Sequence, residues 1–241
     1  MSANALAMYM VASPDLQETI LHDARYSRPP KVTANRDAIS GLIAYNVDPL
    51  RDTATLEGVK AALSRKAAHA ETMPRARDEA KRCIEAIERF QRHENALGMR
   101  GMPLSEPPRL DPLLIEGVAL SIRPHVLMGA DGGRIGAGIV RVAKSPDPDS
   151  CKLEHTRQRR GDERREMNRY TVAMLHLLME AQSGALGTPD RSLCFVADVR
   201  LGERTNAAAD HTARIRALRG ACSQIAKLWP LIEPRNSILN R

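Results

Sequence analysis

Apolar residues recur at helical spacing through the first half of the chain. The segments 53–70 and 72–97 repeat them every three or four positions, which is the period of one face of an α-helix. Shorter helices are predicted at 14–22 and 38–45. Gly98, directly after the longest segment, is a typical helix end. The sequence therefore predicts a mostly helical region over residues 1–107.

The pattern changes after a linker at residues 98–112 that is rich in proline and glycine. Beyond it, apolar runs that are short or partly alternating predict extended chain, and longer periodic runs predict helices. The expected order is extended segments at 113–128, a strand at 134–144, a helix at 163–181, a strand at 192–201 and a helix at 207–228. We expect an α/β fold (α+β is the alternative) over residues 108–241, with a mixed sheet and a crossover helix.

Composition narrows the function classes. Aromatic residues make up only 3% of the 241 residues, so the core is expected to be aliphatic, and aromatic base-stacking platforms are not expected. A net charge of +7 permits attraction to phosphate backbones without requiring it. No run approaches the roughly 18–20 apolar residues of a membrane span, so we expect no membrane partner.

The cysteines are widely separated, which excludes the close pairs of zinc and iron–sulfur sites. Cys83 and Cys194 lie in apolar surroundings and are predicted to be buried free thiols. With no signal peptide and no disulfide framework, a reducing cytoplasm is the expected location.

Strong catalytic signatures are absent from the sequence. It has no GxxxxGK[ST] phosphate loop, no HExxH and no GxSxG. The glycine-rich stretch that begins at Gly132-Gly133 lies between two expected strands, so it predicts a hairpin turn rather than a dinucleotide site. Gly136 and Gly138, inside the second strand, predict a bulge or a close approach of neighbouring chain.

Polar residues with possible chemistry follow the predicted strands in a definite order. Pro124-His125 ends one extended segment and Lys144 ends the next strand. Glu166 and Tyr170 then lie four residues apart on one face of the following helix. This order resembles the RecB-type branch of the PD-(D/E)XK nuclease superfamily, over roughly Leu113–Leu201.

The resemblance implies a nuclease-like core with Lys144, Glu166 and Tyr170 at catalytic positions. His125 stands where the family has a metal-binding aspartate, and Val142 stands where it has the second acid. Mg²⁺ prefers several oxygen ligands, so a divalent metal (Mg²⁺ or Mn²⁺) is possible but is not expected to bind strongly. A lone histidine before an apolar strand is more often structural, which is the alternative for His125, and Asp198 is the other candidate beside the metal position.

Arginines crowd the segment RQRRGDERREMNR at residues 157–169. Guanidinium groups match phosphate oxygens, whereas the interleaved acids also fit a solvated helix start with internal ion pairs. The candidate phosphate-binding residues are Arg141, Arg157, Arg159, Arg160, Arg164 and Arg165. Together with the resemblance, they predict a DNA- or RNA-binding protein with weak or absent phosphodiester hydrolysis.

A second hypothesis is a protein–protein adaptor or assembly subunit without a nucleic-acid role. The N-terminal helices carry long apolar faces, and Met99, Met102 and Leu104 lie in a linker expected to be exposed. Exposed apolar residues of this kind dock onto protein partners.

Overall fold

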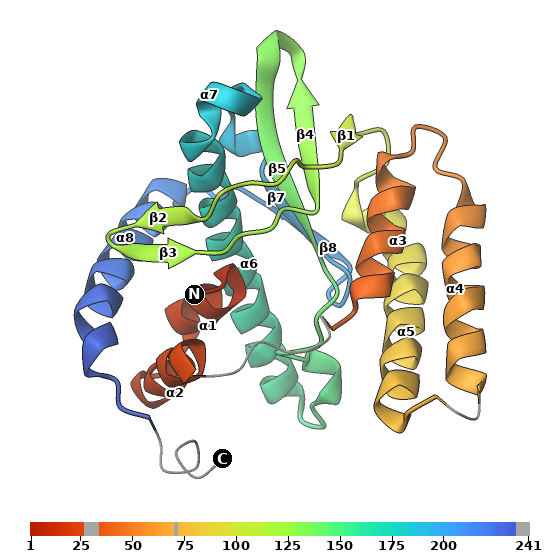
Figure 1. Ribbon diagram of the computed structural model, residues 1–241, viewed down its shortest axis with the longest axis horizontal. Coiled ribbons are helices and arrows are strands. Elements are labelled where there is room, and N and C mark those ends of the chain that lie inside the picture. The colour runs from red at the N-terminus through yellow and green to blue at the C-terminus, as the bar shows by residue number, and fades with distance from the viewer. Residues whose placement is uncertain (27–33, 70–71, 235–241) are drawn as a thin grey trace.

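A mixed six-stranded sheet lies between two groups of helices in the computed structural model, which describes residues 1–26, 34–69 and 72–234 (Figure 1). In spatial order its strands are β1 (Leu104–Ser105), β4 (Val126–Ala130), β5 (Arg134–Arg141), β7 (Phe195–Asp198) and β8 (Glu203–Asn206), with the short β6 (Thr188–Pro189) also paired to β5. β5 and β7 are parallel, and β4 and β8 run antiparallel to them. The predicted α/β class with a mixed sheet is confirmed.

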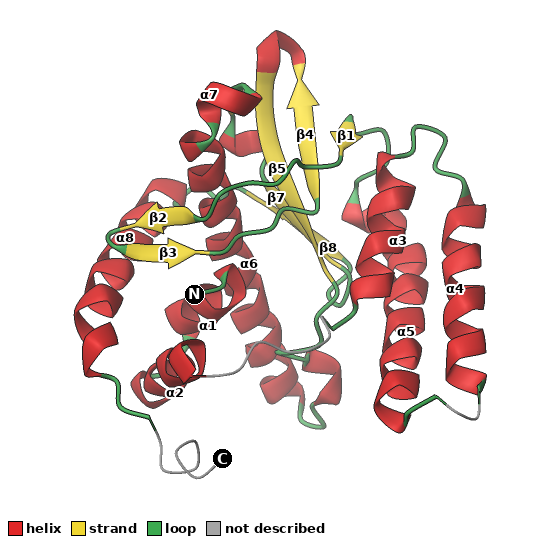
Figure 2. Cartoon of the chain, viewed as in Figure 1, coloured by secondary structure: helices red, strands yellow, loops and turns green. Residues whose placement is uncertain are grey.

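Helices pack on both faces of this sheet (Figures 1 and 2). One face is covered by α3 (Arg36–Val47), α4 (Thr53–Ala68) and α5 (Pro74–Leu97). The other carries α1 (Ala3–Val11), α2 (Pro14–Tyr26), α6 (Glu154–Ala181), the short α7 (Ser183–Leu186) and α8 (His211–Leu228). None of the described helices is long and apolar enough to span a bilayer.

The apolar interior forms two clusters, one on each face of the sheet. Strand β7 shows how they divide, because Phe195 and Ala197 belong to the cluster under α3–α5 while Cys194 and Val196 belong to the other. A strand buried on both faces reads as a continuous apolar run, which is how the sequence predicted it. Both clusters draw residues from either side of position 107. All four cysteines are free and buried.

The segment expected to be one extended stretch from residue 113 is a separate hairpin. β2 (Leu113–Ile115) and β3 (Val118–Leu120) pair with each other and not with the main sheet. Glu116 and Gly117 both have positive φ at the turn, the conformation that favours tight two-residue hairpins. Alternate residues of the hairpin are buried against α6 and α8.

Helix α6 begins at Glu154, nine residues before the predicted start at residue 163. Its first turns carry almost no apolar residues, so no helical periodicity marks them in the sequence. Ion pairs one turn apart support this part of the helix, among them Arg157 with Glu154 and Arg165 with Asp162. Arg157, Arg159 and Arg160 are therefore helical residues, not residues of a preceding loop.

The expected linker at residues 98–112 packs more closely than predicted. Leu104 starts the edge strand β1, and Met99 is fully buried. Met102 and Leu104 pack against the cluster under α3–α5. These residues therefore do not form an exposed apolar segment, and the adaptor hypothesis loses that support.

Candidate functional site

The C-terminal ends of β5 and β7 meet at one edge of the sheet, where Arg141 lies opposite Asp198 in the parallel register. Ligands of α/β sheets bind outside this end of the strands. Helix α6 connects the two strands, and the loop of residues 142–153 leads into it. Most of the sequence-predicted site residues lie on these elements.

Arg164 and Asp198 form an ion pair in the interior of the protein. The Arg164 Nε atom donates to Asp198 Oδ2 at 2.6 Å, and both side chains are fully buried. Arg164 also donates to the carbonyl oxygens of Ala143, Lys144 and Pro146 at 2.8–3.1 Å. It thereby fastens the loop after β5 to α6. The phosphate contact expected of Arg164 does not fit this position.

Asn168 extends the pair into a network, one helical turn after Arg164. Its Nδ2 donates to Asp198 at 2.9 Å, and its Oδ1 accepts from Arg141 at 2.6 Å. Arg141 also donates to Asn4 Oδ1, from α1. Arg141 is only 7% exposed, and burial together with the charge of Arg164 lowers its pKa to about 10. Arg141 is therefore an interior residue as well.

His125 lies beside β5 and not in the open. Its Nδ1 accepts a hydrogen bond from the Val140 N–H at 3.1 Å, so the proton of the neutral ring is on Nε2. Burial lowers the pKa of His125 to about 4. The ring is consequently neutral at pH 7, with its nitrogen lone pair already engaged.

The two residues expected at the metal position do not fit a hard divalent ion. The Asp198 carboxylate accepts hydrogen bonds from the side chains of Arg164 and Asn168. It also accepts hydrogen bonds from the backbone N–H groups of Arg200 and Leu201. His125 offers a ring N–H rather than a free lone pair. Over the ranges that the structure describes, no group of three or more His, Cys, Asp or Glu side chains is placed to hold a metal ion.

Carboxylates do gather near Lys144, but every one of them faces a cation. We call these carboxylates and their cations the rim cluster; its members are Glu85, Asp147, Asp149, Arg89, Lys144 and Arg200. Arg200 NH2 lies 3.0 Å from Glu85, and its NH1 lies 4.0 Å from Asp147 and 3.8 Å from Asp149. Arg89 bridges Glu85 and Asp149, and Lys144 Nζ is 3.8 Å from Asp147. Such alternating charges favour ion pairing over metal binding.

Sequence reasoning missed the carboxylates of the rim cluster. Asp147, whose carboxylate lies 3.8 Å from Lys144 Nζ, and Asp149 come from a loop that carried no predicted role. Glu85 reaches this edge from α5, where it contacts Arg89 and Arg200. The Asp-Pro-Asp run in the loop after β5 was the available signal.

Other arginines of α6 differ in how firmly they are held. Arg165 contacts both Glu203 and Asp162, which raise its pKa, and Arg157 contacts Glu154 and the Cys151 carbonyl. Arg159 is 72% exposed and lies 3.7 Å from Glu163. Arg160 donates to Ser150 Oγ at 3.2 Å. Arg159 and Arg160 are the least constrained of the candidate arginines.

Glu166 and Tyr170 lie against α8 and away from the strand ends. Arg214 of α8 contacts Glu166 and stacks 5.0 Å from the Tyr170 ring centroid. Arg164 and Asn168 occupy the face toward the strands, and positions two residues further along a helix are turned by about 200°. The resemblance puts Glu166 and Tyr170 with Lys144 at catalytic positions, but the structure does not bring these two residues to Lys144. Arg164 and Asn168 are the α6 residues that face the strand ends.

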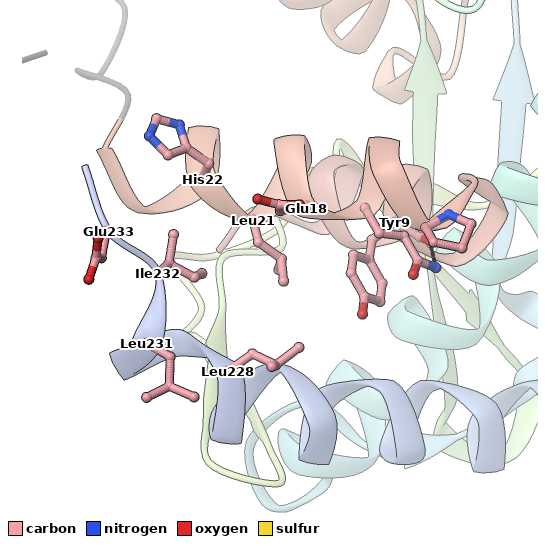
Figure 3. A pocket seen from close by; sticks show the side chains of 10 residues that line it. Tyr9, Glu18, Leu21, His22, Leu228, Leu231, Ile232 and Glu233 are labelled. Atoms are coloured by element: carbon pink, nitrogen blue, oxygen red, sulfur yellow. Dashed lines mark hydrogen bonds between the residues drawn. The ribbon is translucent and has the colours of Figure 1, made fainter. Parts of the chain in front are cut away.

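An apolar hollow lies elsewhere, between α2 and the end of α8 (Figure 3). Its volume is about 480 Å³, and Leu21, Leu228, Leu231 and Ile232 line much of it. Leu231 is 73% exposed. Tyr9, Glu18, His22 and Glu233 also line this hollow, so polar groups border its apolar surface.

Comparisons with family models, curated proteins and solved structures give no match for this chain.

Proposed function

We propose that this protein binds nucleic acid through cations of the β5–α6 loop and the first turns of α6, and that it hydrolyses phosphodiesters weakly or not at all. The observation that carries the proposal is the attachment of this loop to α6. Arg164 holds the carbonyls around Lys144, and Arg160 contacts Ser150 of the same loop. Exposed cations from two segments are thereby fixed on one surface.

The cations of this surface are Lys144, Lys152, Arg157, Arg159 and Arg160. All lie at least partly exposed, which a phosphate backbone requires of its ligands. Contacts of this kind are sequence-independent and strengthen as salt is lowered. The chain's net charge of +7 adds long-range attraction.

The low hydrolytic activity in this proposal follows from the pairing of the carboxylates. Metal-assisted phosphodiester hydrolysis needs carboxylates that are free to hold a hard ion. Asp198 is bound to a buried arginine, and the rim-cluster carboxylates are bound to Arg89, Arg200 and Lys144.

Binding is tested by fluorescence anisotropy with labelled single- and double-stranded DNA and RNA of about 20 nucleotides, at low salt. The triple variant Lys144→Gln/Arg159→Gln/Arg160→Gln is expected to lose at least tenfold in affinity. The matched control Arg216→Gln/Arg219→Gln/Lys227→Gln removes the same charge from exposed positions of α8 and is expected to lose much less. No binding by the wild-type protein at low salt would overturn the proposal.

Hydrolysis is tested on the same substrates with Mg²⁺ and with Mn²⁺. We expect no robust cleavage. Robust cleavage that Lys144→Ala abolishes would restore an active nuclease. Cleavage that the substitution leaves unchanged would place the activity outside this site or in a contaminant.

The assembly-subunit alternative retains one supporting observation, the apolar hollow of Figure 3 with exposed Leu228 and Leu231. Apolar patches of this sort serve as contacts between chains. Light scattering after size exclusion distinguishes the two functions. A wild-type oligomer that Leu231→Glu converts to a monomer supports assembly, and a wild-type monomer counts against it.

A further inference from the structure

A small cavity of about 230 Å³ lies beside the buried network, next to Arg141. Its walls come from α1, the start of α3, β5, β7 and α6. Apolar side chains such as Ile39, Ile139 and Val196 form much of the lining, and Arg141 and His125 are among its polar residues. The cavity is separate from the exposed cations proposed to bind nucleic acid.

Among the residues that the structure describes, no carboxylate forms an ion pair with Arg141. The nearest carboxylate of the network, Asp198, is hydrogen-bonded to the second buried guanidinium, that of Arg164, and to Asn168. The Arg141 guanidinium donates instead to the amide oxygens of Asn168 and Asn4. Burying a charge without a counter-ion is unfavourable, so an anion beside Arg141 would stabilise this arrangement.

Hydrogen-bond donors are available at the same place. A guanidinium has five N–H donors, and Arg141 makes two hydrogen bonds to side-chain oxygens. His125 carries its ring proton on Nε2, because its Nδ1 accepts from Val140. The cavity lining thus pairs a cationic donor and a neutral donor with apolar walls.

We propose that this cavity binds a small carboxylate that has a short apolar body, with the carboxylate on Arg141 and the body against the aliphatic walls. A planar carboxylate matches the guanidinium fork. Since one water occupies about 30 Å³ of liquid, the volume suits an acid of a few carbon atoms. The aliphatic walls favour such an acid over inorganic phosphate, which has no apolar part.

Thermal unfolding of the intact protein tests the assignment. Sodium acetate, butyrate, isobutyrate and phosphate are titrated at constant ionic strength against sodium chloride. A saturable rise in Tm with butyrate or isobutyrate, beyond that with chloride and phosphate, is the expected result. No rise with any carboxylate overturns the proposal. A rise with phosphate alone also overturns it, because the cavity would then be a phosphate site.

Variants locate the response in the cavity. Ala143→Phe, at an exposed position that lines the cavity, is expected to fill it while Arg141 is retained. Arg141→Met removes the cation. Each is expected to weaken carboxylate affinity about tenfold or more. Arg141→Met does so because it removes a charged hydrogen-bond partner, and Ala143→Phe because its ring occupies the space of the ligand. Arg219→Met, on α8, is the charge-matched control and should bind as the wild type does.

If Arg141→Met does not fold, Ala143→Phe decides the question alone. A folded Ala143→Phe variant that keeps the full wild-type response overturns the proposal.

Discussion

The Arg164 side chain joins three parts of the molecule at the ends of β5 and β7. It pairs with Asp198 at the end of one strand, binds carbonyls of the loop after the other strand, and belongs to the helix between them. The pair is completely buried. Removing one partner of such a pair is costly, because the other charge then remains alone in the interior.

Arg164→Met is therefore expected to lower the free energy of unfolding by about 3–5 kcal/mol, because it leaves the Asp198 carboxylate buried without its cation. Urea unfolding at pH 7 measures this. The control is Arg159→Met on the same helix, whose ion pair is exposed and is expected to contribute no more than about 1 kcal/mol. Equal losses in the two variants would contradict the role assigned to Arg164.

His125 makes the stability depend on pH. Burial lowers its pKa in the folded protein from 6.5 to about 4, so between these values the unfolded chain binds the proton more readily. The contribution of His125 to the free energy of unfolding, about 3 kcal/mol, is therefore fully present above pH 6.5. It is lost as the pH falls toward 4.

Unfolding of His125→Gln, compared with the wild type at pH 7 and pH 4.5, tests this dependence. The variant is expected to lose less stability on acidification than the wild type. His155→Gln, at an exposed position, serves as the control. It should lose as much stability between pH 7 and pH 4.5 as the wild type does. An unchanged pH dependence in His125→Gln would refute the assignment.

At the scale of elements, the closeness of β5 and β7 depends on glycine. A Cβ atom at Gly138 would lie 2.3 Å from the Phe195 ring, and one at Gly136 would lie 2.4 Å from the Leu193 backbone. The close approach that the sequence suggested for these two glycines is confirmed. The absence of a side chain at Gly138 leaves room for the Phe195 ring beside β5, in the apolar cluster under α3–α5.

Gly138→Ala is expected to destabilise the protein by about 1–3 kcal/mol, the usual effect of overpacking a core. Gly129→Ala in the neighbouring strand β4 is the control, because a Cβ atom there would meet nothing within 4 Å. Thermal or urea unfolding compares them. If both variants unfold alike, the packing of Phe195 on Gly138 is not as described.

Which elements could be predicted follows from where their signals lie. β7 and the main part of α5 have apolar patterns of their own, and the sequence located both. The first turns of α6 and the strand β8 lack such patterns. Ion pairs support the first turns of α6, and β8 forms by pairing with β7.

The site was harder to predict for a related reason. The burial of Arg164 depends on carbonyl groups that only the folded loop brings together. Within the arginine-rich run nothing distinguishes Arg164 from the exposed Arg159. Arg160 did emerge as a candidate from the charge of this run, and Lys144 from its place after a strand, because neither signal depends on a tertiary partner.

At the scale of the whole molecule, interior and exterior cations take different roles. Arg141 and Arg164 organise the strand ends from inside, while Lys144, Arg159 and Arg160 lie on the outside of the same region. The exterior cations are the ones proposed to meet a phosphate backbone. Counter-ion release from that backbone makes the affinity depend on salt in proportion to the number of contacts.

The salt dependence of DNA affinity tests this account most directly. The logarithm of the affinity is measured against the logarithm of salt concentration for the wild type, for Lys144→Gln/Arg159→Gln/Arg160→Gln and for the α8 control triple. Each lost phosphate contact reduces the slope by about one, so the first triple variant is expected to have a slope shallower by about three. The control is expected to keep the wild-type slope. Equal slopes for all three proteins, or no binding at low salt, would contradict the proposed interface.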